Sequence, residues 1–419
     1  MGIDNLCGLC HVYVQGGGRR RRRPATKEFV AWSASSGERS HIFHQHLPEA
    51  YRTGYGQAIA VGRVRAGGAA QRAGGGRHDG AAGTRGLAAV FTGSPAPSAR
   101  ALTASATGVP RQSGFAGVSC PTADRCVAVG QRVNRVNRSG IEVPLAEAWN
   151  GHRWKVQRAR VPAGARTTRL EAVSCSSARM SMAVGDYTND AGARVPMSQR
   201  WNGRRWAMEP IQAPGSFQTG MSCVSATACT AVGYTDTDDL GVPVAEQWNG
   251  QTWASQRIPA GWSDALNALT GVSCVSARAC VASGYSVAGD GPSVPLAERW
   301  NGLTWEAQPI PSASEELFNF MEGVSCASAG ACVAVGWSAP QDAHGNPSVT
   351  APMAEIWSGG SWAVQPPPSP VGSGRLSGVS CGPAGCTAVG SAPAQTGGPW
   401  ETLAERWDGT AWPIQRTRG

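Results

Sequence analysis

The sequence predicts an all-β fold, a six-bladed β-propeller of four-stranded antiparallel blades, because a unit of about 50 residues occurs six times from residue 113 onward. The first observation is a Val/Met-Ser-Cys motif, whose cysteines are Cys120, Cys175, Cys223, Cys274, Cys326 and Cys381. The second is a Trp-x-x-x-x-Trp motif 25 to 31 residues after each cysteine, which begins at Trp149, Trp201, Trp248, Trp300, Trp357 and Trp407. These motifs hold 12 of the 16 Trp, so the repeat accounts for the unusual Trp content.

Each unit is expected to contain four short strands. In the fourth unit these are 269–274, 280–284 after a five-residue loop, 295–300, and a strand that begins near Trp305. Alternation with a period of two favours strands, and Asn301-Gly302 between the last two is a strong hairpin signal. The sequence leaves open whether this hairpin loop has two or four residues. A helical solenoid is excluded by the period of two and by the Gly and Pro content.

Small residues occupy the same place in the first strand of every unit. They are Gly117, Ala172, Gly220, Gly271, Gly323 and Gly378. We expect these strands to crowd around a central axis, where a side chain would not fit. A seventh, degenerate blade stays open as an alternative, because Ala58-Ile-Ala-Val-Gly62 is similar to a second strand but has no Trp-Asn-Gly motif after it.

The positive charge lies in the first quarter of the chain. Residues 1–112 hold 15 of the 37 Lys and Arg but only 5 of the 28 Asp and Glu, whereas residues 113–419 are close to neutral. The Gly/Ala/Arg-rich composition of 1–112 predicts a disordered basic tail, or a start assigned upstream of the natural one. The near-neutral repeat region argues against a nucleic-acid partner. No apolar run is long enough to span a bilayer, and we expect no integral membrane segment.

Ten of the 13 cysteines form five local pairs with partners five or six residues apart. The pairs are Cys120/Cys126, Cys223/Cys229, Cys274/Cys280, Cys326/Cys332 and Cys381/Cys386. Cysteines on either side of a hairpin loop can reach disulfide distance, and the spacing does not suit zinc. Disulfides imply an oxidising compartment, so we expect a secreted or cell-surface protein. Cys175 has Ser181 where its partner would stand, which leaves either a buried inert thiol or an intermolecular link.

With these motifs in hand, residues 113–416 resemble a group of secreted repeat proteins of high-GC Gram-positive bacteria. The resemblance rests on Val-Ser-Cys, Cys-x-Ala-Val-Gly and Ala-Glu-x-Trp-Asn-Gly-x-x-Trp. Members of the group are mostly uncharacterised, or described as kelch-like or Asp-box-like β-propellers. The resemblance implies the propeller fold and no catalytic residue, because the Asp-box is itself a structural hairpin.

Residues present in every unit are expected to build the scaffold, whereas a ligand site must break the symmetry. By this rule the repeated glutamates, with Gln199 in the second unit, are structural: Glu147, Glu246, Glu298, Glu355 and Glu405. The repeat region assembles no catalytic triad, and we expect no catalytic residue, cofactor or metal. A Ca²⁺ site at Asp236-Thr-Asp238-Asp239 and a haem site at Cys7-x-x-Cys10-His11 are both less favoured than surface turns and coincidence.

Symmetry is broken in two sets of loops that open on the same face of a propeller. Aromatic and acidic candidates for this face are Tyr187, Tyr234, Trp262, Tyr285, Trp337, Asp186, Asp238 and Asp290. Such side chains suit glycan or protein recognition, although the aromatics could instead only cover blade edges. We expect a monomeric, non-catalytic exported binding propeller. The alternative is a glycoside hydrolase or lyase, which needs two unrepeated carboxylates about 5–10 Å apart in a deep pocket.

Overall fold

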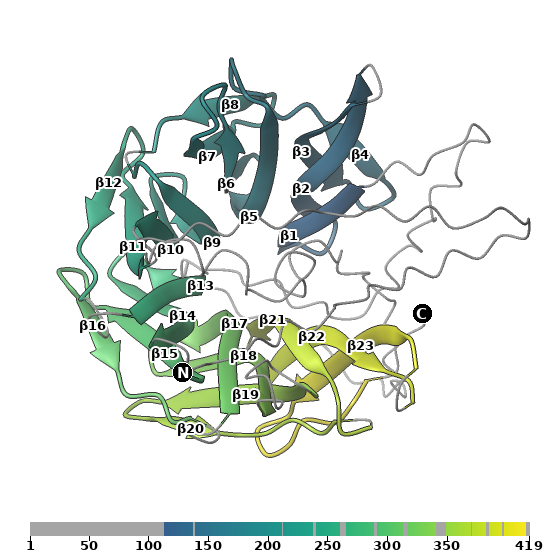
Figure 1. The fold of residues 1–419 in the computed structure, drawn as a ribbon, viewed down its shortest axis with the longest axis vertical. Helices are drawn as coiled ribbons and strands as arrows, with labels where there is room; N and C mark the ends of the chain where they lie inside the picture. The colour runs from purple at the N-terminus through teal and green to yellow at the C-terminus, as the bar shows by residue number, and fades with distance from the viewer. Residues whose placement is uncertain are drawn as a thin grey trace, which may run out of the picture. The chain divides into compact units, whose positions relative to one another are not determined.

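The computed structural model describes residues 113–136, 139–211, 213–237, 240–259, 265–288, 291–312, 317–340, 349–369, 371–382, 385–395 and 398–415. They form six antiparallel sheets that succeed one another as the blades of a propeller (Figure 1). The predicted fold class is therefore confirmed. The predictions made for residues 1–112 lie outside the described residues.

The first three blades each have four strands in sequential order. Blade 1 consists of β1 (Ser113–Thr122), β2 (Arg125–Val136), β3 (Ser139–Trp149) and β4 (Trp154–Gln157). Blade 2 consists of β5 (Thr167–Ser177), β6 (Met180–Thr188), β7 (Arg194–Trp201) and β8 (Trp206–Glu209). Blade 3 consists of β9 (Ser216–Ser225), β10 (Ala228–Thr237), β11 (Leu240–Trp248) and β12 (Trp253–Gln256).

Blades 4 and 5 repeat this order, whereas the last blade departs from it. Blade 4 consists of β13 (Ala265–Ser276), β14 (Ala279–Ala288), β15 (Ser293–Trp300) and β16 (Trp305–Gln308). Blade 5 consists of β17 (Leu317–Ser328), β18 (Ala331–Pro340), β19 (Ala351–Ser358) and β20 (Trp362–Val364). Blade 6 consists of β21 (Arg375–Gly382), β22 (Gly385–Pro393) and β23 (Trp400–Trp407). Its outer edge is only a bridge from Glu405 to Ile414, next to Pro413, which has no N–H to donate.

Blade 4 shows the lengths of two hairpin loops, the one between its first two strands and the one between its last two. The first and second strands of blade 4 continue past the cysteines to Ser276 and Ala279, so the predicted five-residue loop is a two-residue turn. The hairpin between β15 and β16 has four loop residues, with Trp300 paired to Trp305. The Oδ1 atom of Asn301 accepts the N–H groups of Leu303 and Thr304 at 2.9 and 3.0 Å, which closes the loop.

The innermost strands of adjacent blades approach one another closely, as the small residues of the first strand predict. A Cβ atom at Gly220 would lie 3.1 Å from the Cα of Gly271, and one at Gly271 would lie 3.1 Å from the Cα of Gly323. Each innermost strand also has a β-bulge next to this point. The second strand crosses the bulge with a glycine, because a Cβ at Gly185 would lie 2.2 Å from the carbonyl oxygen of Arg169.

A serine-to-backbone bond links each described blade to the next. The serine of the Val/Met-Ser-Cys motif accepts the N–H of the motif cysteine in the following blade. The five bonds, at 2.8–3.0 Å, are Ser119–Cys175, Ser174–Cys223, Ser222–Cys274, Ser273–Cys326 and Ser325–Cys381. The repeated motif is therefore an inter-blade joint as well as a strand.

All five predicted cysteine pairs are disulfides in the structure, and each joins the first strand of a blade to the second. The five links are Cys120–Cys126, Cys223–Cys229, Cys274–Cys280, Cys326–Cys332 and Cys381–Cys386. In four of them the two cysteines are direct partners in the strand register, as Cys223 and Cys229 are. The half-cystines contributed by the second strands are buried: Cys126, Cys229, Cys280, Cys332 and Cys386. The disulfide prediction is therefore confirmed for every pair.

The remaining described cysteine, Cys175, is a buried free thiol whose Sγ lies 3.0 Å from the Oγ of Ser181. Burial raises the pKa of this thiol, which the contact with Ser181 partly opposes. In the part of the chain that the structure describes, no helix is long and apolar enough to cross a membrane.

Candidate functional site

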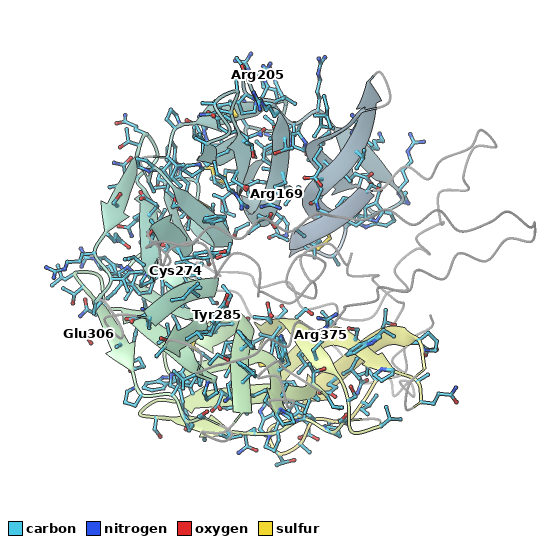
Figure 2. All side chains as sticks on the ribbon, in the orientation of Figure 1. Arg169, Arg205, Cys274, Tyr285, Glu306 and Arg375 are labelled. Atoms are coloured by element: carbon cyan, nitrogen blue, oxygen red, sulfur yellow. A yellow bond between two sulfur atoms is a disulfide. The ribbon has the colours of Figure 1, made fainter. Side chains whose placement is uncertain are left out.

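One position in the blade varies strongly between units. It follows the glycine of the second strand, and it pairs with the sixth residue before the motif cysteine on the first strand. The pairs are Gly114–Gln131, Arg169–Asp186, Phe217–Tyr234, Ala268–Tyr285, Phe320–Trp337 and Arg375–Ser391. In Figure 2 Arg169 and Tyr285 lie toward the inner part of their blades, whereas Arg205 and Glu306 lie at the outer edge.

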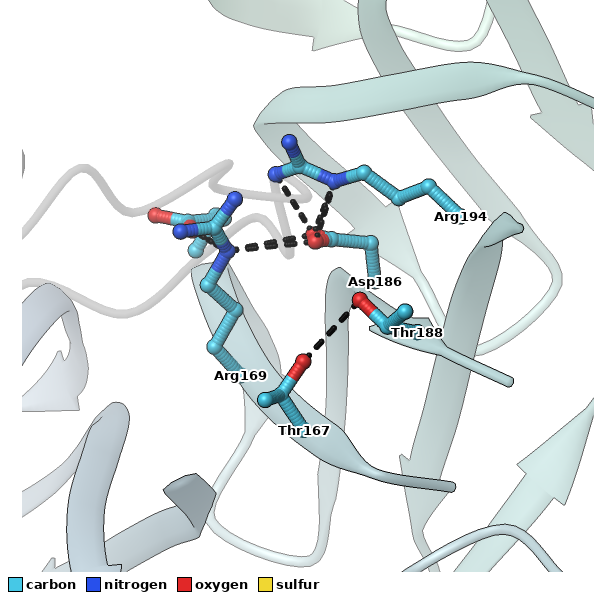
Figure 3. A network of polar contacts seen from close by, with 6 residues as sticks. Thr167, Arg169, Asp186, Thr188 and Arg194 are labelled. Carbon is cyan, nitrogen blue, oxygen red and sulfur yellow. Dashed lines mark hydrogen bonds and ion pairs between the residues drawn. The ribbon is translucent and has the colours of Figure 1, made fainter. Parts of the chain in front are cut away.

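In blade 2 this position holds Arg169 and Asp186, which form the Arg–Asp cluster together with Glu171 and Arg194 (Figure 3). Asp186 is only 4% exposed. The Nε atom of Arg169 lies 3.1 Å from both oxygens of Asp186, and the Nε of Arg194 lies 2.8 and 2.9 Å from the same two oxygens. Both oxygens of this buried carboxylate are therefore occupied by guanidinium groups.

Glu171 is the second carboxylate of the Arg–Asp cluster, and it is the bulge residue of β5. Its Oε1 lies 3.0 Å from the same Nε of Arg169, so the two carboxyl groups lie on one guanidinium. Burial raises the pKa of Glu171 to about 7, against the opposing charge of Arg169. Burial also raises the pKa of Asp186, and Arg169 again opposes it. Burial therefore raises the pKa of both carboxyl groups of the cluster, and it brings that of Glu171 close to neutral.

Arg194 extends the Arg–Asp cluster toward blade 3. Its guanidinium carbon lies 3.8 Å from the centre of the Phe217 ring, and Phe217 stacks on Tyr234 with ring centres 4.8 Å apart. A hollow of about 460 Å³ lies beside this stack. Its lining residues are Ala193, Arg194, Val195, Pro196, Pro214, Gly215 and Phe217. The hollow therefore lies at the junction of blades 2 and 3, between the β6–β7 loop and the connection that leads into β9.

A second group, the aromatic cluster of Tyr285, Phe318, Phe320 and Trp337, fills the same end of blades 4 and 5. Phe320 has ring-centre distances of 4.7 Å to Tyr285 and 4.4 Å to Trp337. The indole N–H of Trp337 donates to Glu322 at 3.0 Å, and burial raises the pKa of that carboxyl. Tyr285, Phe318 and Phe320 are buried, so these rings stabilise the contact between the blades.

The structure divides the predicted ligand-face residues between the two groups. Asp186 belongs to the Arg–Asp cluster, and Tyr285 and Trp337 belong to the aromatic cluster. Tyr234 stacks on Phe217 beside the hollow and also packs against the aromatic cluster. Tyr187 packs against the core between blades 1 and 2, because neighbouring residues of a strand face opposite ways. Trp262, Asp238 and Asp290 lie outside the described residues.

The disulfides belong to the frame and not to this site. In blade 3 the variable position pairs Phe217 with Tyr234, whereas the Cys223–Cys229 link lies six residues further along β9, next to the β9–β10 turn. The same separation holds in blades 5 and 6, whose links use Cys332 and Cys386. The half-cystines therefore close the opposite end of the first hairpin, and they line no part of the hollow.

Sequence reasoning missed Arg169, Glu171, Arg194 and Phe217. Arg169 and Phe217 both stand six residues before a motif cysteine, so aligning the six units on that cysteine would have marked their position as variable. The bulge in the first strand shifts the register by one residue, so the pairing of that position with the residue after the second-strand glycine could be seen only in the structure. Among the described residues no group of three His, Cys, Asp or Glu could hold a metal ion.

Comparisons with known proteins find distant structural neighbours. No family model matches the chain, and no curated protein matches it. A polysaccharide lyase of family PL25, an ulvan lyase, is similar at 11% identity over 70% of this chain and 80% of its own, with a TM-score of 0.49. YCF48 from Cyanidioschyzon merolae is similar at 11% identity over 74% of this chain and 89% of its own, with a TM-score of 0.42. Matches at this level carry no conclusion about substrate. What the structure itself defines is a six-bladed β-propeller in which every blade except blade 2 carries a disulfide.

Proposed function

We propose that this protein is an exported, non-catalytic binding propeller, and that its ligand is a glycan held in the hollow between blades 2 and 3. The observation that carries the proposal is Arg194, which lies over Phe217 in the wall of the hollow while Asp186 holds it in place. Proline and aromatic surface can contact the C–H face of a sugar, and a guanidinium can donate to its hydroxyl groups.

The state of Asp186 supports binding without catalysis. A nucleophile or general base needs a free carboxylate oxygen, whereas both oxygens of Asp186 accept from Arg169 and Arg194. The charges of the cluster nearly balance, which favours a ligand that is polar but not strongly charged. The five disulfides support a secreted or cell-surface location, because they persist in oxidising compartments.

A binding array of plant, algal and bacterial wall polysaccharides, probed with the full oxidised chain, tests the proposal. We expect Phe217→Ala to weaken binding at least about tenfold, because an aromatic anchor beside a hollow carries a large share of binding energy. Leu303→Ala is the matched control, since Leu303 is 85% exposed in the β15–β16 loop at the other end of a blade. Absence of any bound glycan, or equal binding by Phe217→Ala and the parent protein, would overturn the proposal.

A second candidate, a carbohydrate-active enzyme, is favoured by one observation. Glu171 has a pKa of about 7 and shares the Arg169 guanidinium with a second carboxylate, an arrangement suited to a general acid. The test is the release of reducing or unsaturated ends from each polysaccharide that binds. We expect none. Release that disappears in Glu171→Gln, with binding retained, would replace the binding propeller by an enzyme.

A further inference from the structure

Each described blade after the first covers one face of the blade before it. Between blades 1 and 2, Val173 and Trp206 pack against Val127 and Val129. The same valine or methionine and the same fourth-strand tryptophan are buried in blades 3, 4 and 5. The motif valine or methionine and the fourth-strand tryptophan of a unit therefore pack against the second strand of the preceding blade.

Blade 1 has the same two residues, but they are not covered. Val118 is 43% exposed, compared with 7% for its counterpart Val173. Trp154 is 36% exposed, whereas its counterpart Trp206 is completely buried. A valine and a tryptophan that are exposed at positions buried in blades 2 to 5 indicate an interface whose partner is missing.

Blade 6 has the other half of such an interface, a second-strand face that is not fully covered by a following blade. Thr387 is exposed although its counterpart Thr230 is buried, and Val389 is only partly buried although its counterpart Val184 is inaccessible. A Cβ atom at Gly378 would meet nothing within 4 Å, whereas that of Gly323 would lie 3.3 Å from the Cα of Gly378. Among the described strands, β21 contacts β17, β18 and β19, and it shares no comparable interface with β1.

The chain upstream of Ser113 has the length and the pattern to supply the missing partner. The 112 residues before β1 exceed one unit of about 50 residues, and they lead directly into blade 1. Within them, Ala58-Ile-Ala-Val-Gly62 matches Cys126-Val-Ala-Val-Gly130 of β2 at four of five positions when Ile and Val are counted as equivalent. Ile59 and Val61 then correspond to Val127 and Val129, the residues that cover Val173 and Trp206.

We propose that residues 58–62 dock as a strand against the open face of blade 1, where Ile59 and Val61 cover Val118 and Trp154. The segment thereby acts as a partial seventh blade between blades 6 and 1. The occupant is the same chain, because residues 58–62 carry the second-strand pattern and lie upstream of β1 in the same polypeptide.

Hydrogen exchange on the full oxidised chain gives a first test without any substitution. We expect the amides of residues 59–62 to exchange at least about tenfold more slowly than those of residues 66–76, which have no repeat pattern. Equal exchange in the two stretches would overturn the proposal.

Disulfide trapping tests the contact itself. In a full-length Cys7→Ser, Cys10→Ser background, Ile59→Cys is combined with Val118→Cys, and Ala69→Cys with Val118→Cys is the matched control. Mild oxidation followed by peptide mass mapping should give about tenfold more 59–118 link than 69–118 link, because docking raises the effective concentration of the two thiols. Links between two chains would identify a second copy as the occupant, and equal yields would show no docking. Either result would overturn the proposal.

Discussion

Blade 2 and blade 4 have the same backbone frame but different residues at its key positions. In blade 4 Cys274 pairs with Cys280, and in blade 2 the same register places Cys175 opposite Ser181. Blade 4 has Gly271 at the closest approach of the inner strands, where blade 2 has Ala172. The frame thus tolerates the loss of a disulfide and of a glycine in one unit.

The two blades also differ at the variable position and at the repeated acid. Blade 4 pairs Ala268 with Tyr285, whereas blade 2 pairs Arg169 with Asp186. The buried carboxyl of Glu298 in blade 4 is replaced by Gln199, whose amide both donates to and accepts from the backbone of Arg160 at 2.8 Å. Of these two blades, the one that carries the Arg–Asp cluster is therefore the one that departs from the repeat, as expected for a ligand site that breaks symmetry.

Removal of the central carboxylate should have the largest effect. Asp186→Ala leaves Arg194 without its carboxylate partner and leaves Arg169 with Glu171 alone, so we expect it to lower the free energy of unfolding by about 3 kcal/mol. Urea denaturation followed by Trp fluorescence measures the change. The control is Asp190→Ala, because the Asp190 side chain is 78% exposed and its ion pair with Arg166 is loose. Equal losses for both variants would contradict a structural role specific to the Arg–Asp cluster.

Completing the sixth disulfide would make blade 2 like blade 4. Ser181→Cys places a thiol opposite Cys175, whose Sγ is already 3.0 Å from the atom to be replaced. Closing this short loop should stabilise the oxidised protein by about 2 kcal/mol, and the gain should vanish after reduction. Cys274→Ser combined with Cys280→Ser should cost blade 4 about the same amount. Differential scanning calorimetry of each variant measures these changes, and a destabilised oxidised Ser181→Cys protein would show that blade 2 cannot accept the link.

Substitution of the repeated glutamate should change the free energy of unfolding least, and the size of the change should depend on pH. Burial raises the pKa of Glu298 to about 7, above its ordinary value of 4.5. A raised pKa means that the stability linked to the protonated group is complete below about pH 4.5 and is lost as the pH rises through 7. Glu298→Gln should remove this loss, with a gain on the order of 1 kcal/mol at pH 8 and none at pH 4.5.

The reciprocal change tests the same difference from the other side. Gln199→Glu should make blade 2 less stable at pH 8 than at pH 5, because a carboxylate cannot donate to the carbonyl of Arg160 as the amide does. Melting temperatures across this pH range measure both variants. A pH-independent effect of either substitution would place the cause in packing instead of ionisation.

Much of the frame could be predicted because its determinants are local and repeated. The spacing of Cys274 and Cys280 predicts their disulfide, and Trp305 marks the start of its strand. The predicted five-residue loop between those cysteines was wrong, because the strands continue past them around a bulge at Val275. Turn length depends on cross-strand pairing, which a single unit does not reveal.

The site could be predicted only in part, because its members come from five strands and two blades. Asp186 and Tyr234 were found from their place after a glycine, where loop residues begin to vary. Arg169 and Phe217 lie on first strands and look like ordinary strand residues until their pairing is known. Tyr285 has the same sequence context as Tyr234, yet the neighbouring Phe320 buries it. The identity of a residue in the next blade decides whether an aromatic side chain stays accessible.

The serine-to-backbone joint has a consequence for how such a chain can change in length. Each complete unit carries both the acceptor, as in Ser222, and the donor, as in the N–H of Cys223. A duplicated unit therefore brings both halves of the joint with it, and its removal leaves two compatible halves facing each other. The joint is the same at each described junction and does not depend on the number of units. Recombination can therefore add or delete a whole unit while each remaining junction keeps its hydrogen bond.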